Sequence, residues 1–275
     1  MATTVGRAQQ AWEALRQPER LGQGATVKLL HGRFCGRDRF DKEQELRSAV
    51  ATERAFAERK PVVLVATQVV EVSLDVDFDV LFSDPAPLEA LLQRFGRVNR
   101  KGRLESADVV VMAKIPPNSP VYAATLVESA LKCLASSNEK MVDESKVQTW
   151  LDQIYVGEDG EQWKIEVTQA RQDFRRDVLD TLSVFDSSPE LARRFDELFD
   201  GSEVVPKSLE AQYLECLERD PLLASSLLVP ITSRQAGWLN WQGRLKSTSD
   251  GIRVAHTAYD VEIGLQLSRS APDSV

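Results

Sequence analysis

The chain has 275 residues, of which 43% are apolar and 28% charged, and its formal net charge at pH 7 is -8. This composition is typical of a soluble globular protein, and no apolar run approaches the roughly 20 residues that a membrane helix needs. An acidic chain does not coat nucleic acid by bulk charge, so any contact with a polyanion must be local. The start, MATTVGRAQQ, has neither the basic leader nor the apolar stretch of a signal peptide. We therefore expect a cytoplasmic protein with no membrane partner.

The first 116 residues alternate between helical and strand patterns. Apolar residues between 8 and 15 recur at helical spacing, and TVKLL (26–30) follows as a short strand. The composition of 38–59 predicts a helix, and three apolar strands come after it: PVVLVAT (61–67), VLFS (80–83) and DVVVMAK (108–114). This order predicts an α/β fold, a parallel sheet with helices on both faces. Ligands of such sheets bind at the carboxyl ends of the strands, here the loops 66–71 and 82–87.

The pattern becomes mainly helical after the breaker cluster IPPNSP (115–120). Helical stretches are predicted at 121–135, 143–155, 166–182, 189–199 and 208–219. Short apolar stretches at 225–232, 237–241 and 251–260 then predict a small mixed or β-rich unit. We therefore predict a first domain at 1–116, a helical linker region at 117–200 and a C-terminal domain at 201–275.

Metal-ligating residues are few in this chain. Cys35, Cys133 and Cys216 stand alone without a C-x-x-C pair, which argues against a disulfide framework and a zinc site. The chain has two histidines, His31 and His256, which are too few for a multi-ligand histidine centre. The sequence predicts no metal site on this chain.

Three aspartates alternate with apolar residues in VSLDVDFD (72–79). They match the opening of a calcium loop, but Val80 and Ala86 stand where that loop needs Gly and Glu, so we reject calcium binding. One remaining interpretation is a half-buried strand whose apolar residues point inward: Leu74, Val76, Phe78 and Val80. The other is a functional loop, in which Asp75 accepts hydrogen bonds from a ribose hydroxyl. In the same loop Thr67 and Gln68 would donate to a nucleic-acid phosphate.

QRFGRVNRKGR (93–103) places five basic residues in eleven positions, with no acid among them. The preceding PLEALLQRF predicts a helix with one buried apolar face, from which Arg94, Arg97 and Arg100 rise on another side. Gly96 inside that helix would cost about 1 kcal/mol relative to alanine, which favours a close approach by a ligand or another backbone. A solvated basic face is the ordinary interpretation of such a run. The alternative is a phosphate grip, because guanidinium groups bind phosphate oxygens with two donors at once.

Three stretches resemble, in this order, successive motifs of the second RecA-like lobe of superfamily 2 helicases. They are LLHGRF with the Arg and Glu that follow it (29–43), VLVATQVVEVSLDVDFD (63–79) and QRFGRVNRKGR (93–103). Further segments narrow the resemblance to the CRISPR-associated helicase of type I systems, whose full form carries a nuclease. These segments are TTVGRAQ (3–9), DRFDKE (38–43), FDELFDGSEVVPKSLEAQYLECLE (195–218), SSLLVPI (225–231) and AYDVEIGL (258–265). The resemblance spans nearly the whole chain.

The resemblance implies roles for single residues of an ATP site. Arg97 and Arg100 match the arginine fingers that reach the γ-phosphate, and Gln93 matches the residue beside the attacking water. Asp75 matches the ribose contact, and Glu71 steadies the same loop.

The resemblance also implies contacts with nucleic acid. Thr67 matches the strand-contact position, and Gln68, Arg33 and Thr4 are grouped with it as nucleic-acid-binding residues. His31 and Arg39 belong to the same early motif as Arg33. For His31 a satisfied, partly buried histidine is the competing interpretation.

The chain departs from a complete motor in the parts that hold nucleotide. It has no G-x-x-x-x-G-K-[ST] phosphate loop, and its acidic pairs at 143–144 and 196–197 lie in helical rather than strand surroundings. The resemblance therefore implies ATP with Mg²⁺, the metal being held by a first lobe that is absent here. This chain alone is expected to be inactive.

The sequence thus predicts the second motor lobe of an ATP-dependent single-stranded DNA translocase in CRISPR interference. The expected partners are single-stranded DNA, the first RecA-like lobe and a nuclease domain, in one longer protein or in a separate chain, and the CRISPR surveillance complex. One open alternative is a non-enzymatic lobe that binds a partner or nucleic acid. Another is the lobe of a repair or RNA helicase, against which the tail at 195–265 argues.

Overall fold

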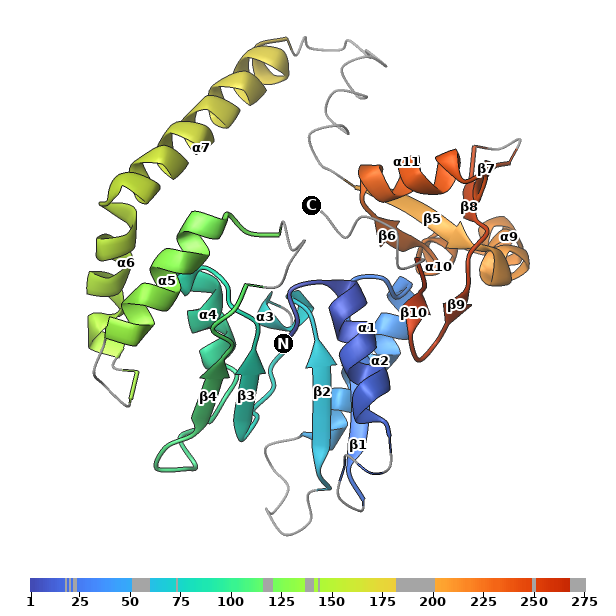
Figure 1. Ribbon diagram of the computed structural model, residues 1–275. Helices are drawn as coiled ribbons and strands as arrows, with labels where there is room; N and C mark the ends of the chain where they lie inside the picture. Colours follow the sequence, from blue (N-terminus) through green and yellow to red (C-terminus); the bar gives the residue numbers. More distant parts are fainter. Residues whose placement is uncertain are drawn as a thin grey trace.

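The computed structural model describes residues 1–17, 19, 21, 24–50, 60–72, 74–115, 121–136, 141–142, 144–181, 201–248 and 251–267. Figure 1 shows an α/β lobe, a group of helices that extends from it, and a smaller mixed unit at the far side of the lobe. The helix expected at 189–199 and the end of the helix expected at 38–59 lie outside the described residues.

The first half of the lobe consists of helix α1 (Val5–Leu15), strand β1 (Thr26–Leu30), helix α2 (Gly36–Ala49) and strand β2 (Val62–Ala66). Helix α1 begins where the Thr4 hydroxyl accepts a hydrogen bond from the Arg7 amide at 3.3 Å, which satisfies one free amide of the first turn. Its Ala8 and Trp12 are buried against β1, as the helical spacing predicts. β1 and β2 are parallel, with Leu30 opposite Ala66.

The second half consists of helix α3 (Val69–Val72), strand β3 (Val80–Ser83), helix α4 (Leu88–Phe95) and strand β4 (Asp108–Val111). β3 and β4 are also parallel. The α/β class with parallel strands is confirmed. The single sheet that we expected is instead two parallel pairs, because no ladder joins β2 to β3 in the described part of the chain.

The half-buried strand, which was one of the two interpretations of the three aspartates, is wrong in its backbone and partly right in its burial. Residues 69–72 form α3, and residues 74–77 form no strand. Leu74 and Val76 are buried while Asp75 between them is exposed, so the alternation holds. Val80, which we expected to point inward, is exposed.

The helical region consists of α5 (Ala124–Ser136), the short η2 (Glu144–Lys146), α6 (Val147–Tyr155), α7 (Glu158–Asp177) and the short η3 (Leu179–Thr181). α5 and α6 pack on α4 through one apolar cluster that includes Leu88, Leu91, Leu126, Trp150 and Ile154. α7 extends away from the lobe in Figure 1 and carries mainly exposed side chains.

The C-terminal unit is mixed. Its elements are β5 (Ser202–Pro206), η4 (Lys207–Leu209), α9 (Glu210–Arg219), α10 (Pro221–Ser225), β6 (Val229–Ile231), α11 (Ser233–Trp241), β7 (Leu245–Ser247), β8 (Arg253–Ala255), β9 (Tyr259–Asp260) and β10 (Gly264–Leu265). Four of the strands form a sheet in the order β6-β5-β8-β7. GWLNW (237–241), one of the short apolar stretches of the predicted mixed or β-rich unit, lies in α11. That helix begins with a capping box of Thr232 and Gln235, a start signal that we had not used.

The C-terminal unit packs directly on the α/β lobe through its last hairpin. Tyr259 donates to the Asp38 carboxylate at 2.7 Å, and the Leu265 amide donates to the Arg33 carbonyl at 2.8 Å. Gly264 has φ +79° and lies so close to the Arg33 carbonyl that a Cβ there would be 2.7 Å from its oxygen, so only glycine fits. Cys35 of the lobe belongs to the apolar core of this unit.

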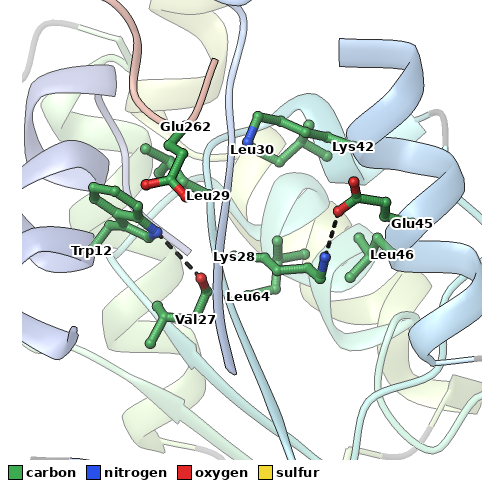
Figure 2. A pocket seen from close by; sticks show the side chains of 10 residues that line it. All are labelled: Trp12, Val27, Lys28, Leu29, Leu30, Lys42, Glu45, Leu46, Leu64 and Glu262. Atoms are coloured by element: carbon green, nitrogen blue, oxygen red, sulfur yellow. Dashed lines mark hydrogen bonds and ion pairs between the residues drawn. The ribbon is translucent and has the colours of Figure 1, made fainter. Parts of the chain in front are cut away.

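A cavity of about 120 Å³ lies beside β1 between α1 and α2, close to Glu262 of the C-terminal unit (Figure 2). Its rim is polar: Lys28 pairs with Glu45 at 2.7 Å, and the Trp12 indole donates to the Val27 carbonyl at 3.4 Å.

His31 joins the lobe to the C-terminal unit and is fully buried. Its Nδ1 accepts from the Arg33 amide at 3.1 Å, so the ring proton lies on Nε2, which donates to the Ile263 carbonyl at 2.9 Å. The interpretation as a satisfied histidine is correct, and the burial is complete rather than partial. Burial lowers the pKa of His31 to about 3, and the hydrogen bond to Ile263 opposes that shift.

This pKa predicts a pH-dependent stability. Between pH 6.5 and 3 the unfolded chain binds a proton at His31 that the folded chain does not. The contribution of His31 to the free energy of unfolding is therefore fully present above pH 6.5 and falls as the pH is lowered below that value. From pH 7 to pH 5 the free energy of unfolding should decrease by about 2 kcal/mol through this group. Urea unfolding at the two pH values should show a smaller decrease in His31→Gln than in the parent chain. Equal decreases in the two chains would contradict the assignment.

Candidate functional site

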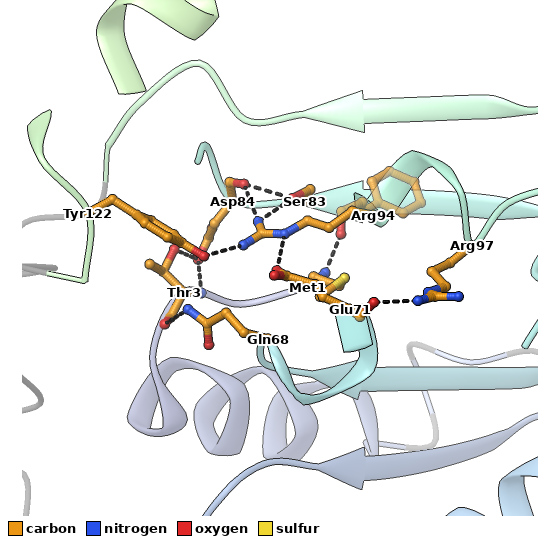
Figure 3. A network of polar contacts seen from close by, with 10 residues as sticks. Met1, Thr3, Gln68, Glu71, Ser83, Asp84, Arg94, Arg97 and Tyr122 are labelled. Carbon is orange, nitrogen blue, oxygen red and sulfur yellow. Dashed lines mark hydrogen bonds and ion pairs between the residues drawn. The ribbon is translucent and has the colours of Figure 1, made fainter. Parts of the chain in front are cut away.

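Arg94 is the centre of a buried polar network at the carboxyl end of β3 (Figure 3). Its side chain is 0% exposed, and its Nε pairs with the Glu71 carboxylate at 2.8 Å. One terminal nitrogen donates to the Ser83 hydroxyl at 2.8 Å and to the Asp84 carbonyl at 3.1 Å, and the other donates to Tyr122 at 3.1 Å. Arg94 therefore connects α3, α4, the end of β3 and the segment before α5. We expected it to lie with Arg97 and Arg100 on a side of the helix away from the buried face, and this is wrong because Arg94 is itself buried.

Asp84 binds the start of the chain to the same end of β3. Its two carboxylate oxygens accept from the Arg7 guanidinium at 2.9 and 2.8 Å, and one of them also accepts from the Thr3 amide at 3.0 Å. Burial raises the pKa of Asp84, but the hydrogen bonds from Arg7 and Thr3 outweigh burial and hold the pKa below its ordinary value. The Asp84 carboxylate is therefore charged, and both of its oxygens accept hydrogen bonds from other parts of the lobe.

The basic stretch after α4 is a turn rather than a helix. Helix α4 ends at Phe95, and Gly96 is its cap with φ -65°. A Cβ on Gly96 would make only ordinary contacts at 3.6 Å, so the close approach that we inferred from a glycine inside a helix is wrong. Asn99 at φ 46° turns the chain, and its side chain holds the Leu104 backbone at 2.8 and 3.0 Å. The turn is thus well defined without a ligand.

Arg97 and Arg100 lie in this turn in two different environments. Arg97 donates to the Glu71 carbonyl, and its buried Nε has no hydrogen-bond partner within the described part of the chain. Arg100 is held by its amide, which donates to Asp77 at 2.7 Å, and its guanidinium lies 3.2 Å from Asp75. Both members of that ion pair face the solvent, with side chains 44% and 73% exposed.

The structure brings the proposed nucleotide residues together around α3 and the turn. Glu71 contacts Arg94 through its carboxylate and Arg97 through its carbonyl. Asp75 and Arg100 form a surface pair, and Gln93 is exposed on the last turn of α4.

The proposed nucleic-acid residues lie at the carboxyl ends of β1 and β2. The Gln68 side chain donates to the Thr3 carbonyl at 3.0 Å, beside the Thr4 cap of α1. Thr67 is only 3% exposed, and Arg33 is also buried. The side chains of Gln68 and Thr4 therefore hold the backbone near the start of α1, while Thr67 and Arg33 are buried beside them.

The cation donors of the turn fit an anionic oxygen. Among the residues that the structure describes, Arg97 has a buried nitrogen without an acceptor, and the guanidinium of Arg100 pairs with an exposed carboxylate, that of Asp75. Across the described ranges, no group of three or more His, Cys, Asp or Glu side chains is arranged to hold a metal ion. Among the helices of those ranges, none combines the length and the apolar character that crossing a membrane requires.

Three features of this region were missed by sequence reasoning. Arg7, Asp84 and Tyr122 carry much of the network, but their partners are far away in the chain. The Arg7 and Asp84 pair spans 77 positions, and no spacing rule connects residues at that separation. The loop 82–87 had been placed at the carboxyl end of a strand, which is the one signal that could have found Asp84.

The parallel strands, their helices and the polar residues at their carboxyl ends define a RecA-like α/β lobe. Residues 1–103 match the family described as "CRISPR-associated nuclease/helicase Cas3, C-terminal". The chain is also 34% identical over 177 residues to the CRISPR-associated endonuclease/helicase Cas3 of Thermus thermophilus, covering 55% of this chain and 19% of that protein. The chain is therefore similar to a C-terminal part of Cas3 proteins.

Two solved structures have a similar fold over 97% of this chain. The crystal structure of T. fusca Cas3 with AMPPNP matches with a TM-score of 0.69 at 22% identity, and the match covers 38% of that chain. A CRISPR RNA-guided surveillance complex in a pre-nicking state contains a chain that matches with a TM-score of 0.63 at 21% identity, and 40% of that chain is covered. The chain thus spans less than half the length of these relatives.

Proposed function

We propose that this chain is the second motor lobe of an ATP-dependent single-stranded DNA translocase in CRISPR interference. The observation that carries the proposal is the turn after α4, which presents Arg100 beside Asp75 at the surface and leaves a nitrogen of Arg97 without an acceptor. The matches to Cas3 relatives, one of them solved with an ATP analogue, support the same assignment.

In this proposal Arg97 and Arg100 stabilise the negative charge that develops on the transferred phosphoryl group. Gln93 orients the attacking water, and Asp75 accepts a hydrogen bond from the ribose. Glu71 positions the turn through its contacts with Arg94 and Arg97. Mg²⁺, held by a first lobe, would neutralise phosphate charge during the reaction.

The nucleic-acid edge completes the proposed motor. Thr67, Gln68, Arg33 and Thr4 would position the DNA backbone at the carboxyl ends of the strands, by contacts that carry no sequence information. The Cas3 relatives are named as nuclease/helicases, and one similar chain belongs to a surveillance complex. A first lobe, a nuclease domain and a surveillance complex are therefore the proposed partners.

A reconstitution experiment tests the proposal. Phosphate release would be measured for this chain, for a Cas3-type first lobe that carries a phosphate loop, and for their mixture, each with and without single-stranded DNA. We expect the chain alone to be inactive, because the donors that cradle the phosphates have no counterpart in its sequence. We expect DNA-stimulated turnover only in the mixture. Turnover by this chain alone would contradict the split site, and association without turnover would favour a non-enzymatic binding module.

A further inference from the structure

Tyr122 lies where the helical region meets the polar network of the α/β lobe (Figure 3). It comes shortly before α5 and after residues 1–103, so the family match gives it no role. Its hydroxyl oxygen accepts a hydrogen bond from a terminal nitrogen of Arg94 at 3.1 Å. Burial raises the pKa of Tyr122, and the charge of Arg94 and a hydrogen bond from Gln68 oppose that rise. One oxygen is therefore shared by donors from two other elements.

Gln68 uses both N–H groups of its side-chain amide within the chain. One donates to the Thr3 carbonyl at 3.0 Å, and the other donates to the Tyr122 oxygen. A phosphate oxygen can therefore bind this amide only by replacing one of these two acceptors. Replacing Thr3 would take a donor from a buried backbone carbonyl, which is costly, whereas Tyr122 keeps the bond from Arg94. Tyr122 is therefore the acceptor that a phosphate would replace.

The other donor to Tyr122 leads to the basic turn. Arg94 is fully buried, and its Nε pairs with the Glu71 carboxylate at 2.8 Å. The Glu71 carbonyl accepts from Arg97, one of the two arginines that we propose to act on phosphate. Hydrogen bonds in such a buried network polarise one another, because little water screens them. A change in the donors to Tyr122 therefore reaches Arg97 through Arg94 and Glu71.

We propose that Tyr122 is a positioning residue that links DNA binding at Gln68 to the placement of Arg97 at the phosphate of ATP. The inference rests on the proposed function and adds to it a means by which single-stranded DNA stimulates turnover. Without DNA, Gln68 and Arg94 both donate to the Tyr122 oxygen. With DNA, Gln68 donates to a backbone phosphate, and Tyr122 holds Arg94 alone. Coupling between sites requires an element with two discrete arrangements, and the Gln68 amide supplies them.

The link is tested first on this chain without ATP. Tyr122→Phe removes the shared oxygen and keeps the ring, which packs on the apolar cluster of α4, α5 and α6. The side-chain N–H signals of Gln68 and Arg97 would be followed by NMR while oligothymidylate is added. In the parent chain both signals should shift with the same apparent Kd. In Tyr122→Phe the Gln68 signal should still shift, and the Arg97 signal should stay near its DNA-free position.

Tyr155→Phe is the matched control for the loss of a hydroxyl. Tyr155 packs on the same apolar cluster, and its hydroxyl donates to the Glu89 carboxylate at the surface, at 2.5 Å. Both NMR signals should shift in this variant as they do in the parent. An Arg97 signal that follows DNA in Tyr122→Phe would overturn the link. A parental Gln68 signal that does not respond to the oligonucleotide would overturn it as well.

Phosphate release from the reconstituted motor gives an independent measurement. The ratio of turnover with saturating DNA to turnover without DNA should fall about tenfold in Tyr122→Phe, the scale of one hydrogen bond to a charged group. Tyr155→Phe should keep the parental ratio. A parental ratio in Tyr122→Phe would refute the link and leave the motor proposal standing. NMR signals that behave as expected in a chain whose mixture shows no turnover would refute the motor and leave the link between Gln68 and Arg97.

Discussion

Replacing Arg100 with alanine is expected to lower DNA-stimulated ATP turnover by the reconstituted motor by about 10³-fold or more, the effect of losing an arginine finger. The stability of the fold should hardly change. The Arg100 guanidinium is half-exposed, and its pair with Asp75 faces the solvent, so its loss should change the free energy of unfolding by less than about 0.5 kcal/mol. The amide bond from Arg100 to Asp77 remains in the variant.

Two further variants make the Arg100 experiment specific. Arg100→Lys keeps the positive charge but loses the planar fork, and it should still lower turnover by more than about tenfold. Lys101→Ala removes the neighbouring charge of the same exposed turn and should leave turnover at the parental rate. Steady-state phosphate release and urea unfolding would be measured on all three. Parental turnover in Arg100→Ala would show that the basic stretch is an ordinary solvated face and that Arg100 does not act on phosphate.

Replacing Arg94 with methionine is expected to lower the free energy of unfolding of this chain by about 3–5 kcal/mol, without any partner present. Arg94 and Glu71 form a buried ion pair at 2.8 Å, with side chains 0% and 9% exposed. Removing the arginine leaves the Glu71 carboxylate buried without its counter-charge. Ser83 and Tyr122 lose their hydrogen-bond donor at the same time.

A double variant separates the buried charge from the loss of packing. In Arg94→Met with Glu71→Leu both charges are gone, and replacing a whole buried pair by apolar residues is often nearly neutral. The double variant should therefore recover much of the stability that Arg94→Met loses, which a double-mutant cycle in urea would measure. Lys101→Ala provides the control for a charge change at the surface. A cost below about 1 kcal/mol for Arg94→Met would show that this pair does not hold the lobe together.

The two arginines illustrate how far sequence reasoning reached into the site. Arg94 and Arg100 have the same chemistry and lie in one basic stretch, and the sequence treated them alike. One proved to be a buried structural contact and the other a surface cation, because Glu71, Ser83 and Tyr122 surround only the first. Burial depends on what other elements bring to a position, and spacing along one helix does not contain that information.

The sequence by itself determined the elements and the class of the fold. The apolar runs of β1, β2, β3 and β4 and the amphipathic spacing of α1 and α4 are local properties, and the structure has all six elements in these places, although α4 ends at Phe95, before the glycine that was expected inside it. The motif order from 29 to 103 also carried the relationship to Cas3, which the family match to residues 1–103 bears out.

Only the tertiary structure decided what depends on distant partners. It arranged the described strands of the lobe in two parallel pairs, tied Arg7 to Asp84 across 77 positions and buried His31 between the lobe and the C-terminal unit. The physical reason is the same in each case. Local patterns fix which backbone conformation a segment prefers, whereas hydrogen-bond pairing and desolvation depend on groups that the fold brings together from remote parts of the chain.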